Sequence, residues 1–223
     1  MPPTRQWHVE DDAEGGPPFY EMREVFPFLS PLVREWRTVA REVITVTGSD
    51  AWTPWPETTL WRPELGHDWR VIPFLHTFPA DDASRSVWID SSCKRFPATV
   101  ALLRRVPGVR TALLSRLGPK TSLSSHQGWA QLSNHVLRCH IGIVVPDAAS
   151  RLSGVVVDDE IRHHSEGGTL VFDDSHIHSA FNNHPTSERV VLIIDVARPA
   201  GVPPGIAIGG TTAELEAFMQ YFH

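Results

Sequence analysis

The stretch "HVLRCHIGIVV", His135–Val145, alternates between two kinds of side chain, which indicates a β-strand with two different faces. One face would carry Leu137, Cys139 and Ile141, and the other Arg138, His140 and Gly142. The first face is apolar and suits packing in a core. The second has two large polar side chains in mid-strand, which fits either a solvated sheet surface or a functional site.

The two-residue period recurs along the chain from Val109 onward. Turn residues (Gly, Pro, Asn and Asp) separate the segments that show it. Besides His135–Val145, the strand candidates are "VRTALLSRL" (109–117), "LSGVVVDDEI" (152–161), "GGTLVFDD" (167–174) and "RVVLIIDVA" (189–197). Several short strands at this spacing favour an antiparallel sandwich or barrel over a parallel α/β sheet.

Helices are predicted before and after this β region. In "SPLVREWRTVAREVI" (30–44), apolar residues recur on one helical stripe, and Ser30 followed by Pro31 suits an N-cap and first turn. The stripe consists of Leu32, Val33, Trp36, Val39, Ala40 and Val43. Further expectations are a wrapping loop (48–68), a strand "WRVIPFLH" (69–76), a helix "PATVALLRRVPG" (97–108) and a terminal helix in 212–222 capped by Thr212.

These segments divide the chain into three parts. Residues 1–18 lack periodicity and are expected to form a flexible arm. Residues 19–199 form one domain, in which N-terminal helices precede the β region. Residues 200–223 are a C-terminal tail with a short helix.

Composition excludes several classes of protein. The 223 residues carry a formal net charge of −6 without a basic run, so neither nucleic acid nor an anionic membrane is an expected partner. The longest apolar runs are too short to span a bilayer, and the N-terminus lacks the features of a signal peptide. The two cysteines lie in unrelated contexts and imply no disulfide framework. We therefore expect a cytoplasmic protein.

Histidines cluster after residue 125, which points to metal chemistry. His126 precedes a predicted strand and His178 follows one, and strand ends and loops are the usual positions of metal-binding imidazoles. Cysteine is absent from this set, so Fe(II) or another metal that binds imidazole and oxygen is a better candidate than structural zinc. Arg189 opens an apolar strand and is expected to need an anion, since a buried guanidinium pairs well with a carboxylate.

Two alternatives remain open at this point. Asp174, His176 and His178 occupy alternate positions and could bind zinc in a hydrolase. The chain could also be a non-catalytic jelly-roll binding protein. The first alternative leaves His126 and Arg189 unexplained, and no HExxH segment accompanies it.

Six segments, in this order, resemble the aspartyl/asparaginyl β-hydroxylase family of Fe(II)- and 2-oxoglutarate-dependent oxygenases. They are "DWRVIPFL" (68–75), "FPATVALLRRVPGV" (96–109), "LSRLGPKTSLSSHQG" (114–128), "LRCHIGIVVP" (137–146), "GGTLVFDDSHIHSAFN" (167–182) and "SERVVLIIDVARP" (187–199). The resemblance implies a mainly β fold, a double-stranded β-helix (a jelly-roll or cupin-like sandwich) with N-terminal flanking helices.

The resemblance also implies an iron site. His126 and His178 match the family's two Fe(II) ligands, and Gly128 stands where most related oxygenases carry a carboxylate ligand. This pattern is similar to the family's two-histidine site. Asp173 and Asp174 would then form a turn or orient a ligand imidazole.

Four more positions match family residues around the co-substrate. The resemblance places Arg189 and Ser115 on the distal carboxylate of 2-oxoglutarate, and His140 beside the co-substrate near iron. Arg138 matches an arginine placed to meet an acidic substrate group or the co-substrate.

The implied activity is hydroxylation of an unactivated C–H bond with Fe(II), 2-oxoglutarate and O2. We expect the β-carbon of an Asp/Asn-like residue as the target, in a free, carrier-bound or peptide substrate with an acidic or amide group. Arg138 could pair such a carboxylate. The sequence contains no apolar segment long enough to span a membrane, which disfavours a lipid acyl substrate and a membrane partner.

Overall fold

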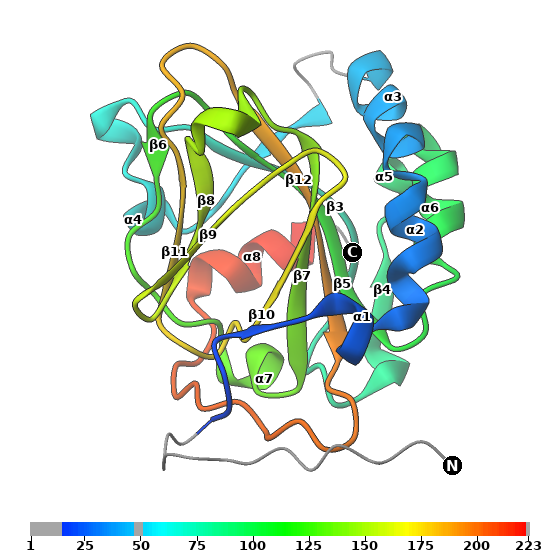
Figure 1. Ribbon diagram of the computed structural model, residues 1–223. Coiled ribbons are helices and arrows are strands. Elements are labelled where there is room, and N and C mark those ends of the chain that lie inside the picture. Colours follow the sequence, from blue (N-terminus) through cyan, green and yellow to red (C-terminus); the bar gives the residue numbers. More distant parts are fainter. Residues whose placement is uncertain (1–14, 47–50, 222–223) are drawn as a thin grey trace.

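Two antiparallel sheets face each other, and helices cover the outer face of the larger sheet (Figure 1). The computed structural model describes residues 15–46 and 51–221. The helices are α1 (Met22–Val25), α2 (Ser30–Arg34), α3 (Trp36–Val46), α4 (Thr58–Trp61), α5 (Asp90–Arg95), α6 (Pro97–Leu103), α7 (Ala130–Ser133) and α8 (Ala213–Tyr221). None of the helices in these ranges is long and apolar enough to cross a membrane.

The larger sheet has the strand order β1-β10-β7-β12-β5-β3-β2, and β4 also pairs with β3. Its strands are β1 (Phe19–Tyr20), β2 (Thr53–Pro54), β3 (Trp69–Thr77), β4 (Ser86–Trp88), β5 (Val109–Leu117), β7 (Val136–Val144), β10 (Thr169–Phe172) and β12 (Arg189–Ala197). The smaller sheet has the order β6-β11-β8-β9. Its strands are β6 (Thr121–Ser122), β8 (Ser153–Val157), β9 (Glu160–His163) and β11 (His178–Asn182).

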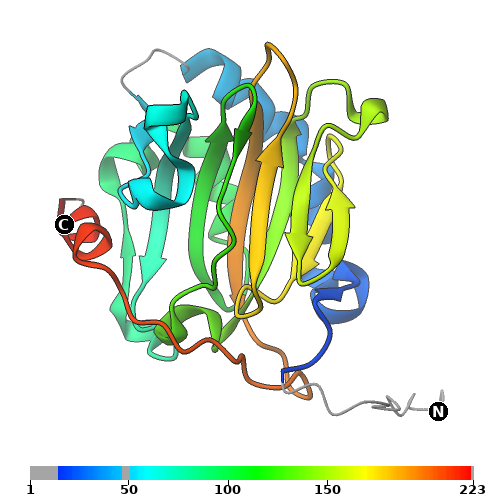
Figure 2. The ribbon, with the colours of Figure 1, turned by 90° about the vertical axis from the view of Figure 1, so that its left-hand side faces the viewer.

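Between β5 and β12 the chain passes repeatedly from one sheet to the other. Strands β5, β7, β10 and β12 lie in the larger sheet, while β6, β8, β9 and β11 lie in the smaller one (Figure 2). This alternation is the topology of a double-stranded β-helix, so the predicted jelly-roll fold with N-terminal helices is confirmed.

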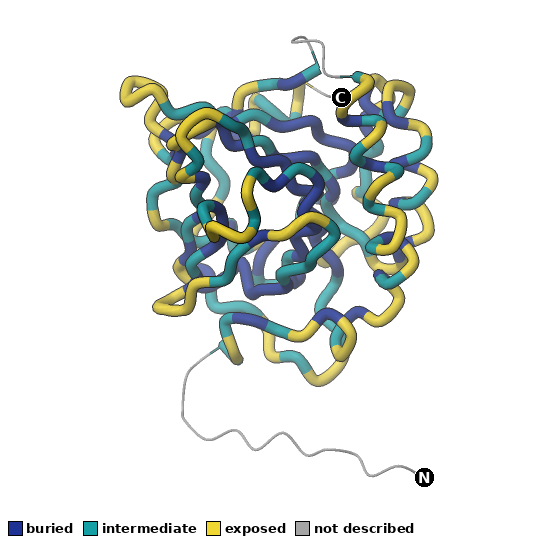
Figure 3. The backbone as a smooth tube through the Cα atoms, turned by 45° about the horizontal axis from the view of Figure 1, so that its top comes forward, coloured by how far each residue is buried: buried dark blue, intermediate teal, exposed yellow. Residues whose placement is uncertain are grey.

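The two faces of β7 separate the hydrophobic core from the candidate site, as the alternation predicted. Cys139 and Ile141 pack with Val39 and Val43 of α3 in the core between the helices and the larger sheet. His140 lies on the opposite face, toward the smaller sheet. Figure 3 shows that buried backbone is concentrated in the strands, whereas exposed positions follow the outer sides of the helices and the loops.

Several predicted boundaries were wrong. The helix predicted over 30–44 is broken at Glu35 into α2 and α3, and Ser30 does not cap it. Ser30 is already helical because its N–H donates to the carbonyl of Pro27, in a 3₁₀ turn that leads directly into α2. The apolar stripe itself is confirmed, since Leu32, Val39 and Val43 are buried.

The segment 152–161 is a hairpin rather than one strand. It contains β8 and the start of β9, and Asp158 at the turn has a φ of 50°, in the left-handed region typical of hairpin turns. Strand β11 was not predicted, because "HSAFN" lacks an apolar run and is recognised only by its pairing with β8. The expected wrapping loop contains β2 and α4.

The C-terminal helix and its cap are confirmed. Helix α8 begins at Ala213, and the N–H of Leu215 donates to Oγ1 of Thr212 at 3.2 Å. Most of the predicted arm over residues 1–18 falls outside the described residues.

Candidate functional site

His126 and His178 lie side by side because their backbones pair. His178 is the first residue of β11, and His126 lies in the loop after β6. The N–H of each residue donates to the carbonyl of the other, at 2.9 and 2.8 Å. Their ring centroids are 4.3 Å apart. A short antiparallel bridge therefore holds the two imidazoles against each other.

Backbone carbonyls also fix the tautomer of both rings. Nδ1 of His126 lies 2.8 Å from the carbonyl oxygen of Ser124, and Nδ1 of His178 lies 2.9 Å from that of His176. Since a carbonyl only accepts, each Nδ1 carries the hydrogen and each Nε2 keeps its lone pair. Burial lowers the pKa of His178 well below its ordinary value, which favours the neutral ring. The Nε2 atoms of the two rings are therefore the ones left to bind a divalent metal.

Asp174 occupies the space that a side chain at position 128 would need. A Cβ atom on Gly128 would overlap Oδ2 of Asp174, and the N–H of Gly128 donates to the Asp174 carbonyl at 2.8 Å. Oδ1 of Asp174 lies 3.2 Å from Nε2 of His178. Oδ2 is buried and has no hydrogen-bond partner among the described residues. Glycine is thus required at 128, and an orphaned carboxylate oxygen lies near the imidazole pair, which fits a bound cation.

The described part of the chain contains no group of three His, Cys, Asp or Glu that could hold a metal. A metal here would therefore depend on the two imidazoles, and the two-histidine site stays a prediction. The zinc alternative gains no support, because both ring nitrogens of His176 already contact oxygen atoms of the protein and none is left for a metal. Its Nδ1 lies 2.7 Å from Oδ2 of Asp158, and its Nε2 lies 3.3 Å from the carbonyl oxygen of Gly15.

Arg138 is paired with two aspartates inside the protein. Its Nε and Nη2 donate to the two carboxylate oxygens of Asp195, at 2.7 and 3.0 Å, and its Nη1 donates to Oδ1 of Asp174. Both carboxylates are buried, and burial raises the pKa of each although Arg138 opposes this. The fork of Arg138 therefore holds Asp174 in place beside His178.

Arg189 is a buried cation that forms no ion pair with any described residue. Its side chain is 1% exposed, its Nε has no hydrogen-bond partner in the described ranges, and Nη1 reaches the Ser115 carbonyl only at 3.5 Å. Burial lowers the pKa of Arg189 to about 9. The hydroxyl of Ser115 accepts a hydrogen bond from Nε1 of Trp69 at 3.1 Å, so its own hydrogen can be donated. The pair fits the carboxylate of a bound molecule.

A second buried histidine accompanies His140. Nδ1 of His140 lies 3.2 Å from Nε2 of His164, and burial lowers the pKa of both rings well below the ordinary value. His164 is only 3% exposed, although the sequence around it would predict a surface or loop histidine. No local pattern distinguishes it, because its partner lies on another strand.

Asp173 forms a turn, which was one of its predicted roles. Its Oδ1 accepts from the N–H and the hydroxyl of Ser175, at 3.0 and 2.6 Å, and both its oxygens accept from Arg198.

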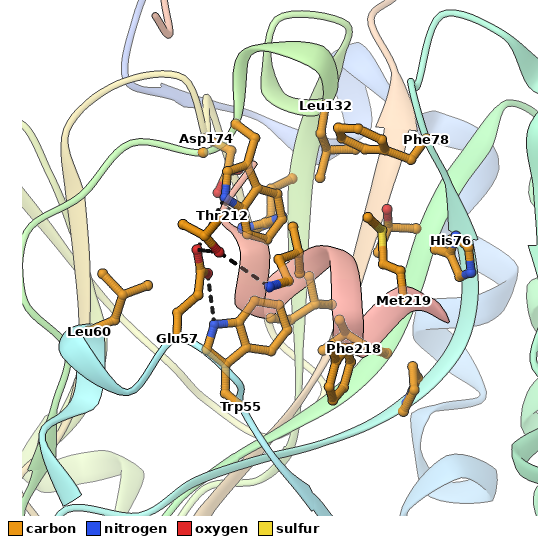
Figure 4. A pocket seen from close by; sticks show the side chains of 18 of the residues that line it. Trp55, Glu57, Leu60, His76, Phe78, Leu132, Asp174, Thr212, Phe218 and Met219 are labelled. Atoms are coloured by element: carbon orange, nitrogen blue, oxygen red, sulfur yellow. Dashed lines mark hydrogen bonds and ion pairs between the residues drawn. The ribbon is translucent and has the colours of Figure 1, made fainter. Parts of the chain in front are cut away.

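A cavity of about 290 Å³ opens beside the histidine pair, on the side toward β3 and α8 (Figure 4). His126, Arg138 and Asp174 line one part of it. Apolar residues from distant parts of the chain line much of the rest, including Trp55, Trp69, Trp129, Leu215, Phe218 and Met219. The sequence did not identify these residues as part of a site, because they converge only in the folded chain.

The Aspartyl/Asparaginyl beta-hydroxylase family model matches residues 33–199, most of the chain. The chain belongs to this family. Family members that it resembles include the ornithine lipid ester-linked acyl 2-hydroxylase of Rhizobium tropici, with 30% identity over 85% of this chain and 63% of the relative. Another is the human aspartyl/asparaginyl beta-hydroxylase, with 31% identity over 51% of this chain and 15% of the relative. The chain thus spans less than two thirds of the length of either relative.

Among solved structures, an oxidoreductase of the 2OG-Fe(II) oxygenase family from Burkholderia pseudomallei is similar to this β-hydroxylase family member, with a TM-score of 0.48. The two share 15% sequence identity over 74% of this chain and 81% of the other.

Proposed function

We propose that the chain is an Fe(II)- and 2-oxoglutarate-dependent hydroxylase. The observation that carries this proposal is the pairing of two features inside one β-helix. One is the pair of imidazoles at His126 and His178, whose Nδ1 atoms both face backbone carbonyls, and the other is the buried cation Arg189, which lacks a carboxylate partner among the described residues. Family membership supports the same chemistry.

In this proposal the Nε2 atoms of His126 and His178 hold Fe(II). When bound, iron together with 2-oxoglutarate and O2 supplies hydroxylation of an unactivated C–H bond, with release of succinate and CO2. Arg189 and the hydroxyl of Ser115 bind the distal carboxylate of 2-oxoglutarate. His140 lies on the same inner face and is kept neutral by burial, so it can contact the co-substrate without adding charge.

Arg138 has a positioning role in this scheme. The sequence predicted that it meets an acidic substrate group, but its donors already face Asp174 and Asp195. We propose that it holds the Asp174 carboxylate near Nε2 of His178.

Four classes of substrate remain candidates: a free small molecule, a carrier-bound residue, a peptide and, from the name of the Rhizobium relative, a lipid acyl chain. The expectation of an Asp/Asn-like group depended on a free Arg138, and it loses that support. A cytoplasmic location stays a proposal, supported by the free thiols of Cys93 and Cys139.

The experiment that tests the function is an anaerobic titration of the metal-free protein with Fe(II) and then 2-oxoglutarate. We expect the visible charge-transfer band of the iron–oxoglutarate chelate to form in the wild type. It should be lost in His126→Ala and His178→Ala. His176→Ala is the matched control, since His176 is equally buried but directed elsewhere. Absence of the band in the wild type, or its loss only in His176→Ala, would refute the proposal.

A further inference from the structure

The cavity beside the histidine pair has an aromatic wall. The ring of Trp55 stacks on Trp69 and Trp129, with centroids 4.6 and 6.0 Å apart, and Phe218 of α8 lies 5.9 Å from Trp55 (Figure 4). Leu215 of α8 is buried in the same apolar cluster. Such a wall favours apolar contact with whatever fills the cavity.

The glutamate and the arginine that line the cavity already have hydrogen-bond partners within the protein. The carboxylate of Glu57 accepts from Nε1 of Trp55 at 3.1 Å, from Oγ1 of Thr212 at 2.8 Å and from Nε1 of Trp129 at 3.4 Å. Among the described residues that line the cavity, Arg138 is the only Arg or Lys, and two aspartates occupy its fork. An acidic side chain entering here would lose its hydration without gaining a free cation.

Helix α8 contributes part of this wall from outside residues 33–199, the part of the chain that matches the family. The segment leading to it crosses below the strands (Figure 2). Hydrogen bonds fix this segment at three points. The carbonyl of Gly209 accepts from the N–H of Ala130, Asn134 exchanges two hydrogen bonds with Ala207, and Thr212 donates to Glu57. These hydrogen bonds therefore fix the position of α8 against the rest of the domain.

At its outer end the cavity meets a second hollow. The two share His76, Phe78 and Met219, and the second hollow is also lined by Arg85 and Glu216. The two neighbouring hollows together reach from His126 to the charged side chains of Arg85 and Glu216. An elongated occupant would place its apolar part inside and its polar end at this charged rim.

We propose that this cavity binds an unbranched aliphatic chain of the substrate, and that α8 is the element that selects it. This inference rests on the proposed hydroxylase function and names its substrate class as an acyl-type chain. It replaces the expectation of an acidic substrate. Arg138 cannot bind a substrate carboxylate while it is paired with Asp174 and Asp195.

The test uses the 223-residue chain and 1-octanoylglycerol below its micellar concentration, with N-acetylaspartate amide as the acidic comparison. Three of the eight tryptophans line the cavity, so intrinsic fluorescence reports binding without metal. We expect saturable binding of octanoylglycerol and none of the aspartate derivative. Phe218→Glu and Met219→Glu should each weaken octanoylglycerol binding about tenfold or more. Ala217→Glu adds the same charge at an exposed position of α8 and should leave binding unchanged.

Binding of the aspartate derivative alone, or equal weakening by Ala217→Glu, would overturn the inference. Met219 lies at the rim and is partly exposed, so its variant stays informative if Phe218→Glu does not fold. The chelate band is recorded on the same samples. A band without octanoylglycerol binding refutes only the substrate class, whereas octanoylglycerol binding without a band upholds the cavity assignment and refutes the iron chemistry.

Discussion

The inner face of the larger sheet serves two regions of opposite character. The co-substrate region, around Arg189, Ser115, His140 and His164, is polar and fully buried, and contains a cation without a carboxylate partner among the described residues. The substrate region, the cavity next to β3 and α8, is mostly apolar, and its Glu57 and Arg138 already have hydrogen-bond partners within the protein. The difference indicates that the first region suits the carboxylate of one particular co-substrate, while the second suits the apolar part of a substrate.

The two regions also differ in where their residues come from. The four residues of the co-substrate region lie within the part of the chain that matches the family, as do most residues of the substrate region, but α8, which lines part of the cavity, lies beyond it. We infer that the family part of the chain supplies the chemistry, and that α8 is where this chain adjusts the selection of the substrate. Four predictions test this division.

The largest expected effect is at Arg189. Arg189→Met removes the proposed partner of the 2-oxoglutarate carboxylate, and losing one partner of a buried pair costs about 3–5 kcal/mol. The Kd for 2-oxoglutarate should therefore rise about 10²–10⁴-fold, measured by the chelate band. Octanoylglycerol binding should not change.

Arg116→Met is the control, because Arg116 lies on the neighbouring strand and is paired with Asp68 and Glu188. The Arg189 variant should also be no less stable to heat without ligand, since it loses an unpaired buried charge. If both variants bind 2-oxoglutarate as the wild type does, the polar region is not the co-substrate site.

The second prediction concerns Arg138, at the boundary of the two regions. Arg138→Met leaves Asp174 and Asp195 buried without their cation, which should lower the free energy of unfolding by about 3–5 kcal/mol in urea denaturation. Arg70→Met, which breaks a partly exposed ion pair with Asp68, should cost at most about 1 kcal/mol. Equal losses in the two variants would show that the triad is not tightly coupled.

The third prediction tests whether Glu57 secures α8. Glu57→Gln replaces a carboxylate that accepts three hydrogen bonds, so α8 should lose about 1.5–3 kcal/mol of local stability. Faster hydrogen exchange at the amides of Ala213–Tyr221 would report this loss, with 2-oxoglutarate binding unchanged. Glu64→Gln, an exposed change in the same segment, should not alter hydrogen exchange. If it has the same effect as Glu57→Gln, the hydrogen bonds of Glu57 do not secure α8.

The smallest effect is a pH dependence from the co-substrate region. Burial lowers the pKa of His140 and His164, so the native rings stay neutral while the unfolded chain takes up protons below about pH 6.5. Stability should therefore fall as pH falls through this range, by up to about 1.4 kcal/mol per pH unit for each ring.

His164→Gln should remove one ring's share of this slope, measured by urea denaturation of the metal-free protein between pH 7 and 5. His135→Gln, at an exposed position, is the control and should leave the slope as it is. An unchanged slope in His164→Gln would contradict the assignment of a buried neutral ring.

The sequence by itself determined the faces of the strands. Alternation along β7 assigned Cys139 and Ile141 to the core and left His140 for the site, because the side-chain period of a strand is a local property. The fold class followed from the same period, and the opposed pair His126 and His178 followed from the family resemblance. These features depend on neighbouring residues or on a fixed order of segments.

Only the tertiary structure decided which groups meet. Arg138 is paired with Asp195 across 57 residues, His140 meets His164 across 24, and α8 closes a cavity begun by Trp55. No local pattern could specify these partners, because a buried charge is neutralised by whichever group the packed sheets bring within reach. For that reason Arg189, Ser115 and His140 could be named from the family resemblance as a proposed co-substrate site, while His164 and the substrate region became visible only in the folded chain.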